Sequence, residues 1–144
     1  MESWLAGLPP GGEANWVTGS HDIGRVSSRV GAHLVDHLNM LHLLLPGVAV
    51  TYQGEELGMS DTALTWEETR DPAGCACGPA AYQQCSRDPE RTPLQWTNAS
   101  QAGFTSGSHP WLPVNPDYTE VNVAAEEEAG HASHLGVYRW SDGR

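Results

Sequence analysis

Hydrophobic residues in this chain form two short strand-like runs with one long helical stripe between them. The runs 14–18 and 48–52 are apolar and are bounded by Gly, Pro and Ser, which is typical of short buried strands. From about Gly24 to Leu45, apolar residues recur at steps of three or four positions, and Pro46-Gly47 ends the pattern as a helix stop does. Strand, helix and strand in this order predict a βαβ unit, in which the two strands are parallel.

Further helical patterns lie at both ends of the chain. Met1 to Leu8 is expected to be the end of a helix that 9–12, Pro-Pro-Gly-Gly, stops. A last helix is expected from about Val121 to Trp140, with Glu126–Glu128 as a solvated acidic face near its start. Between the second strand and this helix, Gly54 to about Asp117 shows little periodicity, and a loop of this length in a compact domain is usually functional.

The acidic composition of the chain limits the kinds of molecule that it is expected to bind. The formal net charge is −11, and all seven basic residues are Arg. An acidic surface without basic patches argues against nucleic acid and anionic membranes as partners. The longest apolar stretch, Met40–Pro46, is interrupted by His42 and is too short to span a bilayer. The sequence Asn98-Ala99-Ser100 is a glycosylation sequon, so we expect glycosylation at Asn98 and a secreted or lumenal protein, although no signal peptide is visible after Met1.

The cysteines are odd in number: Cys75, Cys77 and Cys85. Cys75 and Cys77 are too close to pair comfortably, so Cys85 is expected to bridge to one of them, and we take Cys75–Cys85 as the candidate disulfide. The remaining thiol is then free or pairs outside this sequence. A zinc site is the weaker interpretation, because such sites usually need four ligands and no His lies near these cysteines, so no metal or cofactor is predicted.

Polar residues whose side chains could take part in catalysis or binding follow the first predicted strand. Ser20, His21 and Asp22 come directly after it, and Arg25 comes three residues later. A buried parallel strand delivers such side chains at its C-terminal end, where α/β barrels keep their active sites. A lone His-Asp pair is more often a solvated turn or a helix cap, so the pattern needs support from the rest of the chain.

That support comes from a resemblance in four separate blocks. They resemble the α-amylase superfamily of glycoside hydrolases, in particular its maltases and other α-glucosidases, in the family's order and at roughly its spacing. The segment 15–26 is similar to the strand-seven region, where the family has Asn-His-Asp and this chain has Ser20 in place of the Asn. The other blocks are 51–59 (the strand-eight motif), 86–96 (Arg-Asp-x-x-Arg-Thr-Pro-x-Gln-Trp) and 111–116 (Trp-Leu-Pro-Val-Asn-Pro), and 71–75 is closest to arthropod maltases.

The resemblance implies an α/β fold, a partial (β/α)8 TIM barrel. Residues 1–144 would be the C-terminal part of the catalytic barrel: strands seven and eight, their helices, and a long loop after strand eight at about 54–117. A complete barrel needs roughly 250 residues, so the rest of the barrel is expected from sequence upstream of Met1. The family's nucleophile Asp and acid Glu, at the ends of strands four and five, would lie there as well.

The resemblance also implies roles for particular residues. Glycoside hydrolysis needs two carboxyl groups beside the scissile bond, and a third can stabilise the developing charge. Asp22 matches that third carboxylate, the transition-state stabiliser, and His21 matches its hydroxyl-donating partner. Arg87 matches a residue of the innermost sugar subsite, and Arg25 and Arg91 complete the expected substrate-binding set. The alternative for Arg87 is an ion pair with a nearby carboxylate, and for Arg91 the two interpretations are equally good.

Other polar residues are expected to be structural. Glu55 and Glu56 are adjacent, so they point in different directions and are expected to support the barrel rim rather than to catalyse. His33, His37 and His42 are expected to be solvated on an outer helix. Among the aromatic residues, Trp66, Trp96 and Trp111 could stack on sugars, although packing against the barrel is the more common role of Trp in such a loop.

The function implied is that of a retaining α-glucosidase that hydrolyses maltose, sucrose or short α-glucosides, with this fragment inactive alone. The alternative is a non-catalytic heavy subunit of an amino-acid transporter, a relative that shares this ectodomain and can be membrane-anchored through missing sequence. Such subunits tend to lose the strand-seven His-Asp and the Arg-Asp block, and this chain has both, at His21-Asp22 and Arg87-Asp88.

Overall fold

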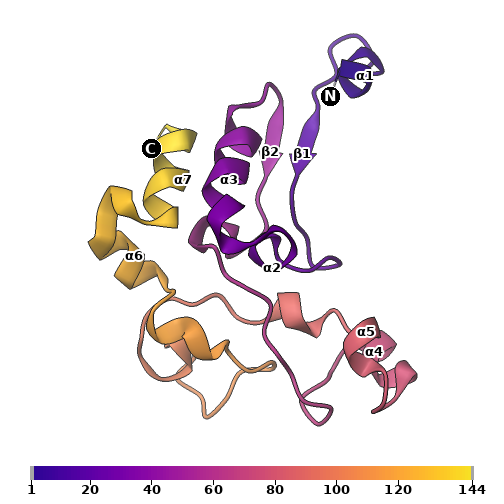
Figure 1. Ribbon diagram of the computed structural model, residues 1–144, viewed down its shortest axis with the longest axis vertical. Helices are drawn as coiled ribbons and strands as arrows, with labels where there is room; N and C mark the ends of the chain where they lie inside the picture. Colours follow the sequence, from indigo (N-terminus) through magenta and orange to yellow (C-terminus); the bar gives the residue numbers. More distant parts are fainter. Residues whose placement is uncertain (1, 144) are drawn as a thin grey trace.

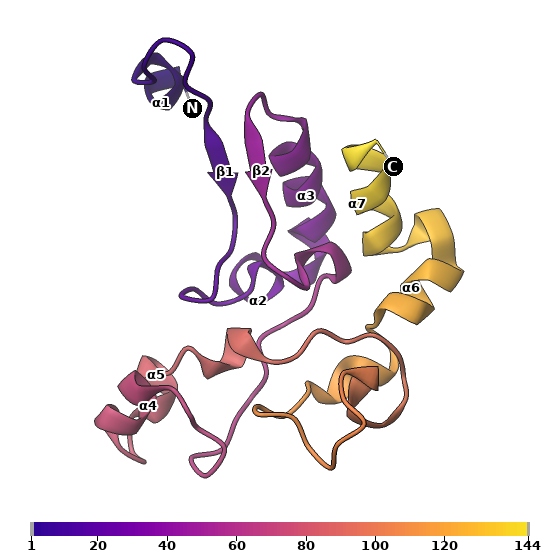
Figure 2. The same ribbon diagram turned by 180° about the vertical axis from the view of Figure 1, so that it is seen from behind.

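The computed structural model describes residues 2–143 and has an α/β architecture. Figures 1 and 2 show two halves: strands and long helices in one, and the long irregular segment in the other. The elements in chain order are α1 (Glu2–Ala6), β1 (Asn15–Val17), α2 (Val26–Val30), α3 (Val35–Leu44), β2 (Val48–Val50), α4 (Pro72–Cys77), α5 (Tyr82–Cys85), α6 (Val123–Ala129) and α7 (His134–Asp142).

The predicted βαβ unit is present. Strands β1 and β2 pair in parallel, with Trp16 opposite Ala49 in the register, and α2 and α3 form the connection between them. His42 of α3 ties helix and sheet together, because its Nε2 lies 2.7 Å from the carbonyl oxygen of Trp16 and 3.1 Å from the amide nitrogen of Val50. The expectation that His42 is solvated is therefore wrong, since the side chain is buried against both strands.

Glycines divide the two long helices that the periodicity predicted. The helix expected over 24–45 is interrupted at Gly31, where φ is +93° and a Cβ would come within 2.9 Å of the His33 ring. A 3-10 turn over Ala32–Leu34 then leads into α3. The last helix is interrupted at Gly130, where φ is +61°. Positive φ values are accessible to glycine at little cost, which explains why the helices end at these two positions.

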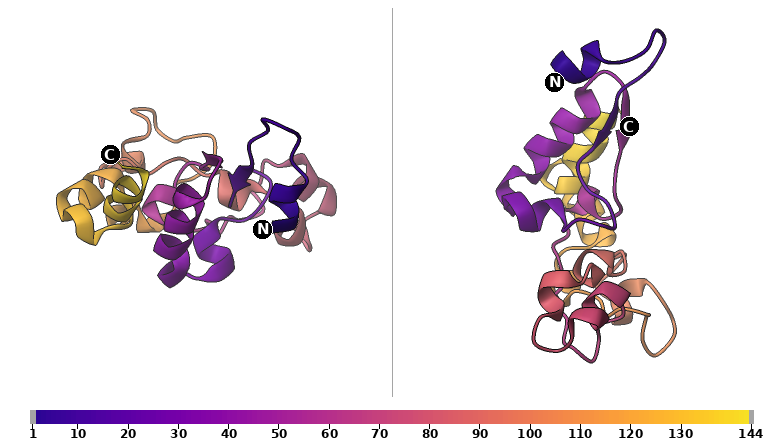
Figure 3. Two further views of the ribbon diagram at one scale, coloured as in Figure 1. Left: turned by 90° about the horizontal axis from the view of Figure 1, so that it is seen from above. Right: turned by 90° about the vertical axis from the view of Figure 1, so that its right-hand side faces the viewer.

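The acidic face expected on the last helix is only partly exposed. Glu126 is buried, and its Oε2 accepts a hydrogen bond of 2.8 Å from the backbone N–H of Leu135 at the start of α7. Burial raises the pKa of this carboxyl. The prediction of a solvated face is thus wrong for Glu126, because the break at Gly130 folds α7 back against α6 (Figure 3).

The hydrophobic core joins the two halves of the molecule. Leu57, Met59 and Leu135 form a buried cluster that connects the segment after β2 to α7. Partly buried residues of the long segment and of α6 pack on this cluster: Leu94, Val121 and Val123. The irregular segment is therefore anchored at its beginning and its end, which fixes where its middle part can lie.

The long segment contains more structure than its composition indicated. Helices α4 and α5 lie side by side in it, joined by a disulfide between Cys77 and Cys85 with a Cα–Cα distance of 6.5 Å. The candidate pair Cys75–Cys85 is thus wrong, and Cys75 is an exposed free thiol. A bridge from Cys85 to one of the two neighbouring cysteines was expected; which one was decided by the course of α4, whose last residue is Cys77.

Candidate active site

The site forms where the long segment reaches back to the C-terminal end of β1. Asp22 lies in a tight turn there, and its backbone N–H donates to Ser20 Oγ over 3.2 Å. Its side chain is 55% exposed, so the carboxylate is open to solvent and to a ligand. Ser20, which stands where the family pattern has Asn, thus still supplies an oxygen that holds the turn.

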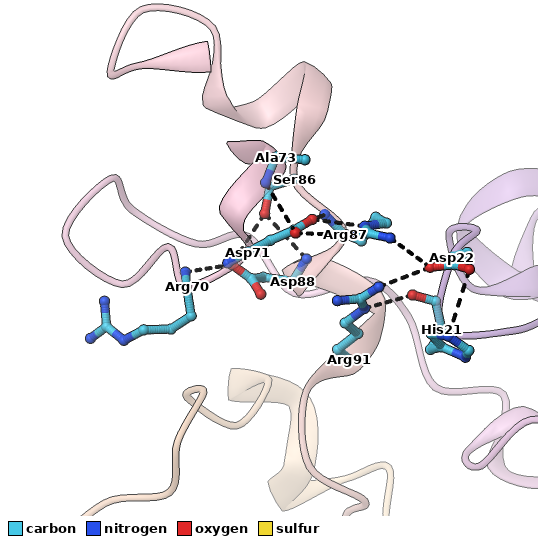
Figure 4. A network of polar contacts seen from close by, with 9 residues as sticks. All are labelled: His21, Asp22, Arg70, Asp71, Ala73, Ser86, Arg87, Asp88 and Arg91. Atoms are coloured by element: carbon cyan, nitrogen blue, oxygen red, sulfur yellow. Dashed lines mark hydrogen bonds and ion pairs between the residues drawn. The ribbon is translucent and has the colours of Figure 1, made fainter. Parts of the chain in front are cut away.

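Two arginines from the long segment converge on this one carboxylate (Figure 4). Arg87 Nη1 and Arg91 Nη2 each donate to Asp22 Oδ1 over 2.9 Å. Arg91 Nε also donates to the carbonyl oxygen of His21 over 2.6 Å, so this side chain grips both residues after β1. The structure therefore brings together four of the five residues predicted for the site: His21, Asp22, Arg87 and Arg91.

Arg87 is held from behind by Asp71, which the sequence reasoning missed as a site residue. Its Nε and Nη2 donate to the two carboxylate oxygens of Asp71, each over 2.9 Å, and its backbone N–H donates to Oδ2 over 2.8 Å. The Asp71 side chain is fully buried. The hydrogen bond to Arg87 is the main reason that the pKa of Asp71 lies far below its ordinary value, and the same bond raises the pKa of Arg87. Arg87 is thus a fixed cation pointing at Asp22.

A buried carboxylate keeps this arrangement in place. Asp88 Oδ2 accepts hydrogen bonds from the backbone N–H groups of Arg70 (2.6 Å) and Asp71 (2.8 Å), and from Ser86 Oγ (3.2 Å). Asp71 also caps α4 by accepting from the N–H of Ala73, and Pro72 occupies the first helical turn. The order Asp-Pro before a short helix is the sequence signal that marks Asp71 as a capping residue.

The electrostatics favour an ionised Asp22. Desolvation raises the pKa of this carboxyl, but the hydrogen bond from Arg87, the neighbouring His21 and the hydrogen bond from Arg91 together outweigh it, so the pKa lies below the ordinary value. His21 Nε2 lies 3.6 Å from Asp22 Oδ2, and its ring is 69% exposed. The site therefore presents a carboxylate and an imidazole side by side at an open surface.

Arg25 does not join them. Its side chain is 2% exposed, with Nη1 donating to the carbonyl oxygen of Gln53 (2.7 Å) and Nη2 to that of Thr92 (3.2 Å). The guanidinium lies 5.4 Å from the centre of the Tyr52 ring. The expectation that Arg25 binds substrate is wrong, because its side chain is buried and its hydrogen bonds connect the residues after β2 to the segment that carries Arg91.

Glu55 has contacts of the supporting kind that was expected of it. Oε1 accepts from Thr18 Oγ1 over 3.0 Å, and Oε2 accepts from the backbone N–H of Tyr52 over 2.9 Å, so it links the ends of β1 and β2. A Cβ at Gly19 would lie 2.4 Å from Glu55 Oε1, which explains the glycine directly before the site. Glu56 accepts from the N–H of Gly54, and burial raises its pKa.

Other expectations concern the surface. The sequon residues Asn98, Ala99 and Ser100 are all exposed. Within residues 2–143, no three or more His, Cys, Asp or Glu side chains are grouped so that they could hold a metal ion. None of the helices described is long and apolar enough to cross a bilayer.

Comparison with known proteins places this geometry in a family. The α-amylase catalytic domain matches residues 1–140. The chain belongs to the α-amylase family. Among its relatives, maltase 1 of Drosophila virilis is 49% identical over 140 residues, 96% of this chain and 22% of the relative. The α-glucosidase of Apis mellifera is 50% identical over 128 residues, 89% of this chain and 23% of the relative. An amino-acid transporter heavy chain of Mus musculus is 39% identical over 128 residues, 88% of this chain and 17% of the relative.

Solved structures of the α-amylase family agree with the fold. Trehalose-6-phosphate hydrolase of Bacillus licheniformis matches with a TM-score of 0.80 and 29% identity over 92% of this chain and 27% of that one. Isomaltulose synthase of Erwinia rhapontici NX5 matches with a TM-score of 0.80 and 30% identity over the same shares, 92% and 27%. The chain thus spans about a quarter of the length of the relatives that it matches.

Proposed function

We propose that this chain is the C-terminal part of the (β/α)8 barrel of a retaining α-glucosidase, with β1 and β2 as strands seven and eight. The whole enzyme would hydrolyse maltose, sucrose or short α-glucosides. Support comes from 48–50% identity to several insect maltases and α-glucosidases. The names of two salivary α-glucosidases among the relatives support secretion.

The observation that carries the proposal is the solvent-open carboxylate of Asp22, fixed by two guanidinium groups. In glycoside hydrolysis, positive charge develops on the sugar ring in the transition state. A preorganised carboxylate stabilises that charge more than it stabilises the neutral substrate, which lowers the barrier. We assign this role to Asp22, and to His21 the donation of a hydrogen bond to a sugar hydroxyl. Arg87 and Arg91 hold Asp22 ionised and oriented.

The covalent and proton-transfer steps need a nucleophile and an acid that we assign to strands outside this chain. Retaining enzymes place these two carboxyl groups about 5 Å apart. Glu55 and Glu56 are not candidates for them, since both are occupied with backbone and hydroxyl hydrogen bonds beside the sheet. The division of labour therefore gives this chain transition-state stabilisation and substrate binding, and gives the remaining barrel the bond-breaking groups.

A non-catalytic transporter subunit is the second candidate, favoured by the 39% identity to the mouse heavy chain. The intact His21-Asp22 pair and its clamp by Arg87 favour the enzyme. A non-catalytic transporter subunit has no use for a solvent-open carboxylate that two arginines keep ionised, whereas a glycosidase needs one to stabilise the charge of the transition state.

The test is the hydrolysis of a chromogenic α-glucoside by the complete protein and by its Asp22→Asn variant. This change keeps the shape and removes the charge, so kcat should fall by a factor on the order of 10² to 10³. Glu128→Gln, at an exposed carboxylate on α6, is the matched control and should leave kcat unchanged. A complete protein without activity would favour the transporter subunit, and an Asp22→Asn variant with normal kcat would refute the role given to Asp22.

A further inference from the structure

A pocket of about 330 Å³ opens in the long segment and takes no part in the site at Asp22. Its wall includes Glu68, Arg70, Gln101, His109 and Trp111. Arg70 directly precedes Asp71, yet Figure 4 shows its guanidinium pointing away from Asp22. The pocket thus lies next to the candidate active site in the chain, but the side chains of that site do not line it.

Trp111 is held at the surface by its own sequence. It is 66% exposed, the largest exposed fraction among the big hydrophobic side chains of residues 2–143. The next residue, Leu112, is buried and anchors the segment. Pro110 and Pro113 flank the pair, and their rings fix φ at both positions. The indole is therefore held by a stiff segment, so this segment would lose little conformational entropy when a ligand stacks on the indole.

The charged groups of the pocket are also preset. Arg70 Nη1 donates to the carbonyl oxygens of Glu67 (2.6 Å) and Thr69 (3.0 Å), which orients the guanidinium. Glu68 Oε2 accepts from the N–H and the hydroxyl of Thr65, each over 2.9 Å. The backbone hydrogen bond from Thr65 lowers the pKa of Glu68, which keeps it ionised. The pocket thus offers a fixed donor group and a fixed acceptor group beside the indole.

Another part of the pocket wall is held by a strained turn. Gln101 and Ala102 have φ values of +55° and +54°, in the left-handed region that costs non-glycine residues free energy. The turn places Gln101 in the wall, where its Nε2 donates to the carbonyl oxygen of Ser108 over 2.9 Å. Ala102 is fully buried, and its carbonyl oxygen accepts from the N–H groups of Trp96 and Thr97, so packing and hydrogen bonds maintain the strain.

We propose that this pocket is an accessory carbohydrate site that binds an α-linked gluco-oligosaccharide. A glucose ring has an apolar C–H face, which stacks on an indole, and an edge of hydroxyl groups, which pair with charged donors and acceptors. Trp111 provides the stacking surface, while Arg70 and Glu68 bind the hydroxyls. The choice of α-linked glucose as the ligand rests on the proposed function.

The experiment uses β-cyclodextrin, a cyclic α-linked glucose oligomer without a chain end for an exo-acting enzyme to cleave. Its binding to the complete protein is measured by calorimetry. Trp111→Ala should weaken binding by about tenfold or more, because it removes the stacking surface. Arg70→Gln should weaken it less. Trp111→Phe should retain part of the affinity, which guards against a folding defect in the alanine variant.

The matched control is Trp140→Ala on α7, since that indole is 63% exposed but lies in a different pocket. It should leave cyclodextrin binding unchanged. Asp22→Asn should lower kcat on a chromogenic α-glucoside by a factor on the order of 10² to 10³ while cyclodextrin still binds, which separates this proposal from the proposed function. The proposal is overturned if β-cyclodextrin does not bind at millimolar concentration, or if Trp111→Ala and Trp140→Ala weaken binding equally.

Discussion

The ion pair between Asp71 and Arg87 allows a prediction that separates positioning from catalysis. Asp71 is fully buried and accepts three hydrogen bonds from Arg87, one of them from the backbone. Replacing it by Asn keeps the volume but turns one acceptor oxygen into a donor NH2 that faces the donors of Arg87. The helix α4 keeps its cap, because Asn is as good an N-cap residue as Asp.

The magnitude follows from burial. Removing one partner of a fully buried ion pair costs about 3–5 kcal/mol. The Arg87 side chain is 40% exposed and regains water, so the cost here should be lower, about 2–3 kcal/mol in the free energy of unfolding. Arg87 would also lose its fixed direction toward Asp22. We therefore expect kcat to fall roughly tenfold to a hundredfold, less than for Asp22→Asn.

The assay is urea unfolding together with kcat on a chromogenic α-glucoside, both on the complete protein. Glu127→Gln is the matched control, since it breaks an Arg–carboxylate pair of 2.7 Å in which both side chains are 49% exposed. Exposed pairs contribute about 0–1 kcal/mol, so this variant should be nearly unchanged. If Asp71→Asn and Glu127→Gln lose the same stability, the argument from burial is wrong. If Asp71→Asn keeps full kcat, catalysis does not depend on Asp71 holding Arg87 in its direction toward Asp22.

The contribution of the Asp71–Arg87 ion pair should also be visible in how the free energy of unfolding depends on pH. The pKa of Asp71 is lowered in the folded protein, so its contribution is complete above the unfolded value of about 3.9 and is lost as the pH falls toward the lowered value. The stability difference between the wild type and Asp71→Asn should therefore be constant at neutral pH and shrink below about pH 4. A difference that grows on acidification would contradict this assignment.

Three further predictions test other features. Cys77→Ser, which opens the eight-residue loop closed by the disulfide, should cost about 2–3 kcal/mol in urea unfolding, whereas Cys75→Ser should cost little; equal losses would contradict the pairing. Asn98→Gln should abolish the mobility shift that peptide-N-glycosidase produces in protein secreted from eukaryotic cells, and an unchanged shift would place the glycan elsewhere. The 144-residue chain alone should not turn over a chromogenic α-glucoside faster than a buffer control does. Turnover above that control which persists after the chain is purified again would refute this prediction.

The local and repeated features of the fold follow from the amino-acid sequence alone. Apolar runs and a three-to-four-residue stripe were sufficient for the βαβ unit, since strand and helix periods depend on neighbours a few residues away. The contiguous blocks at 20–22 and 86–96 were sufficient for the family, because each motif lies within one stretch of chain. The pattern predicted each long helix as continuous, whereas Gly31 and Gly130 adopt positive φ values and divide them.

Which polar side chains contact one another depends on how distant segments of the chain pack together. Arg87 and Asp22 are 65 residues apart, and Arg87 and Asp71 are 16 apart, so no local pattern pairs them. Arg25 follows Asp22 by three residues and looked like its neighbour in the site, yet it is buried because carbonyl groups of two distant segments need its donors. Local sequence sets backbone conformation through short-range sterics and hydrogen bonds. The choice of partner for a charge depends on which buried groups would otherwise stay unpaired, and that is settled only when distant segments pack together.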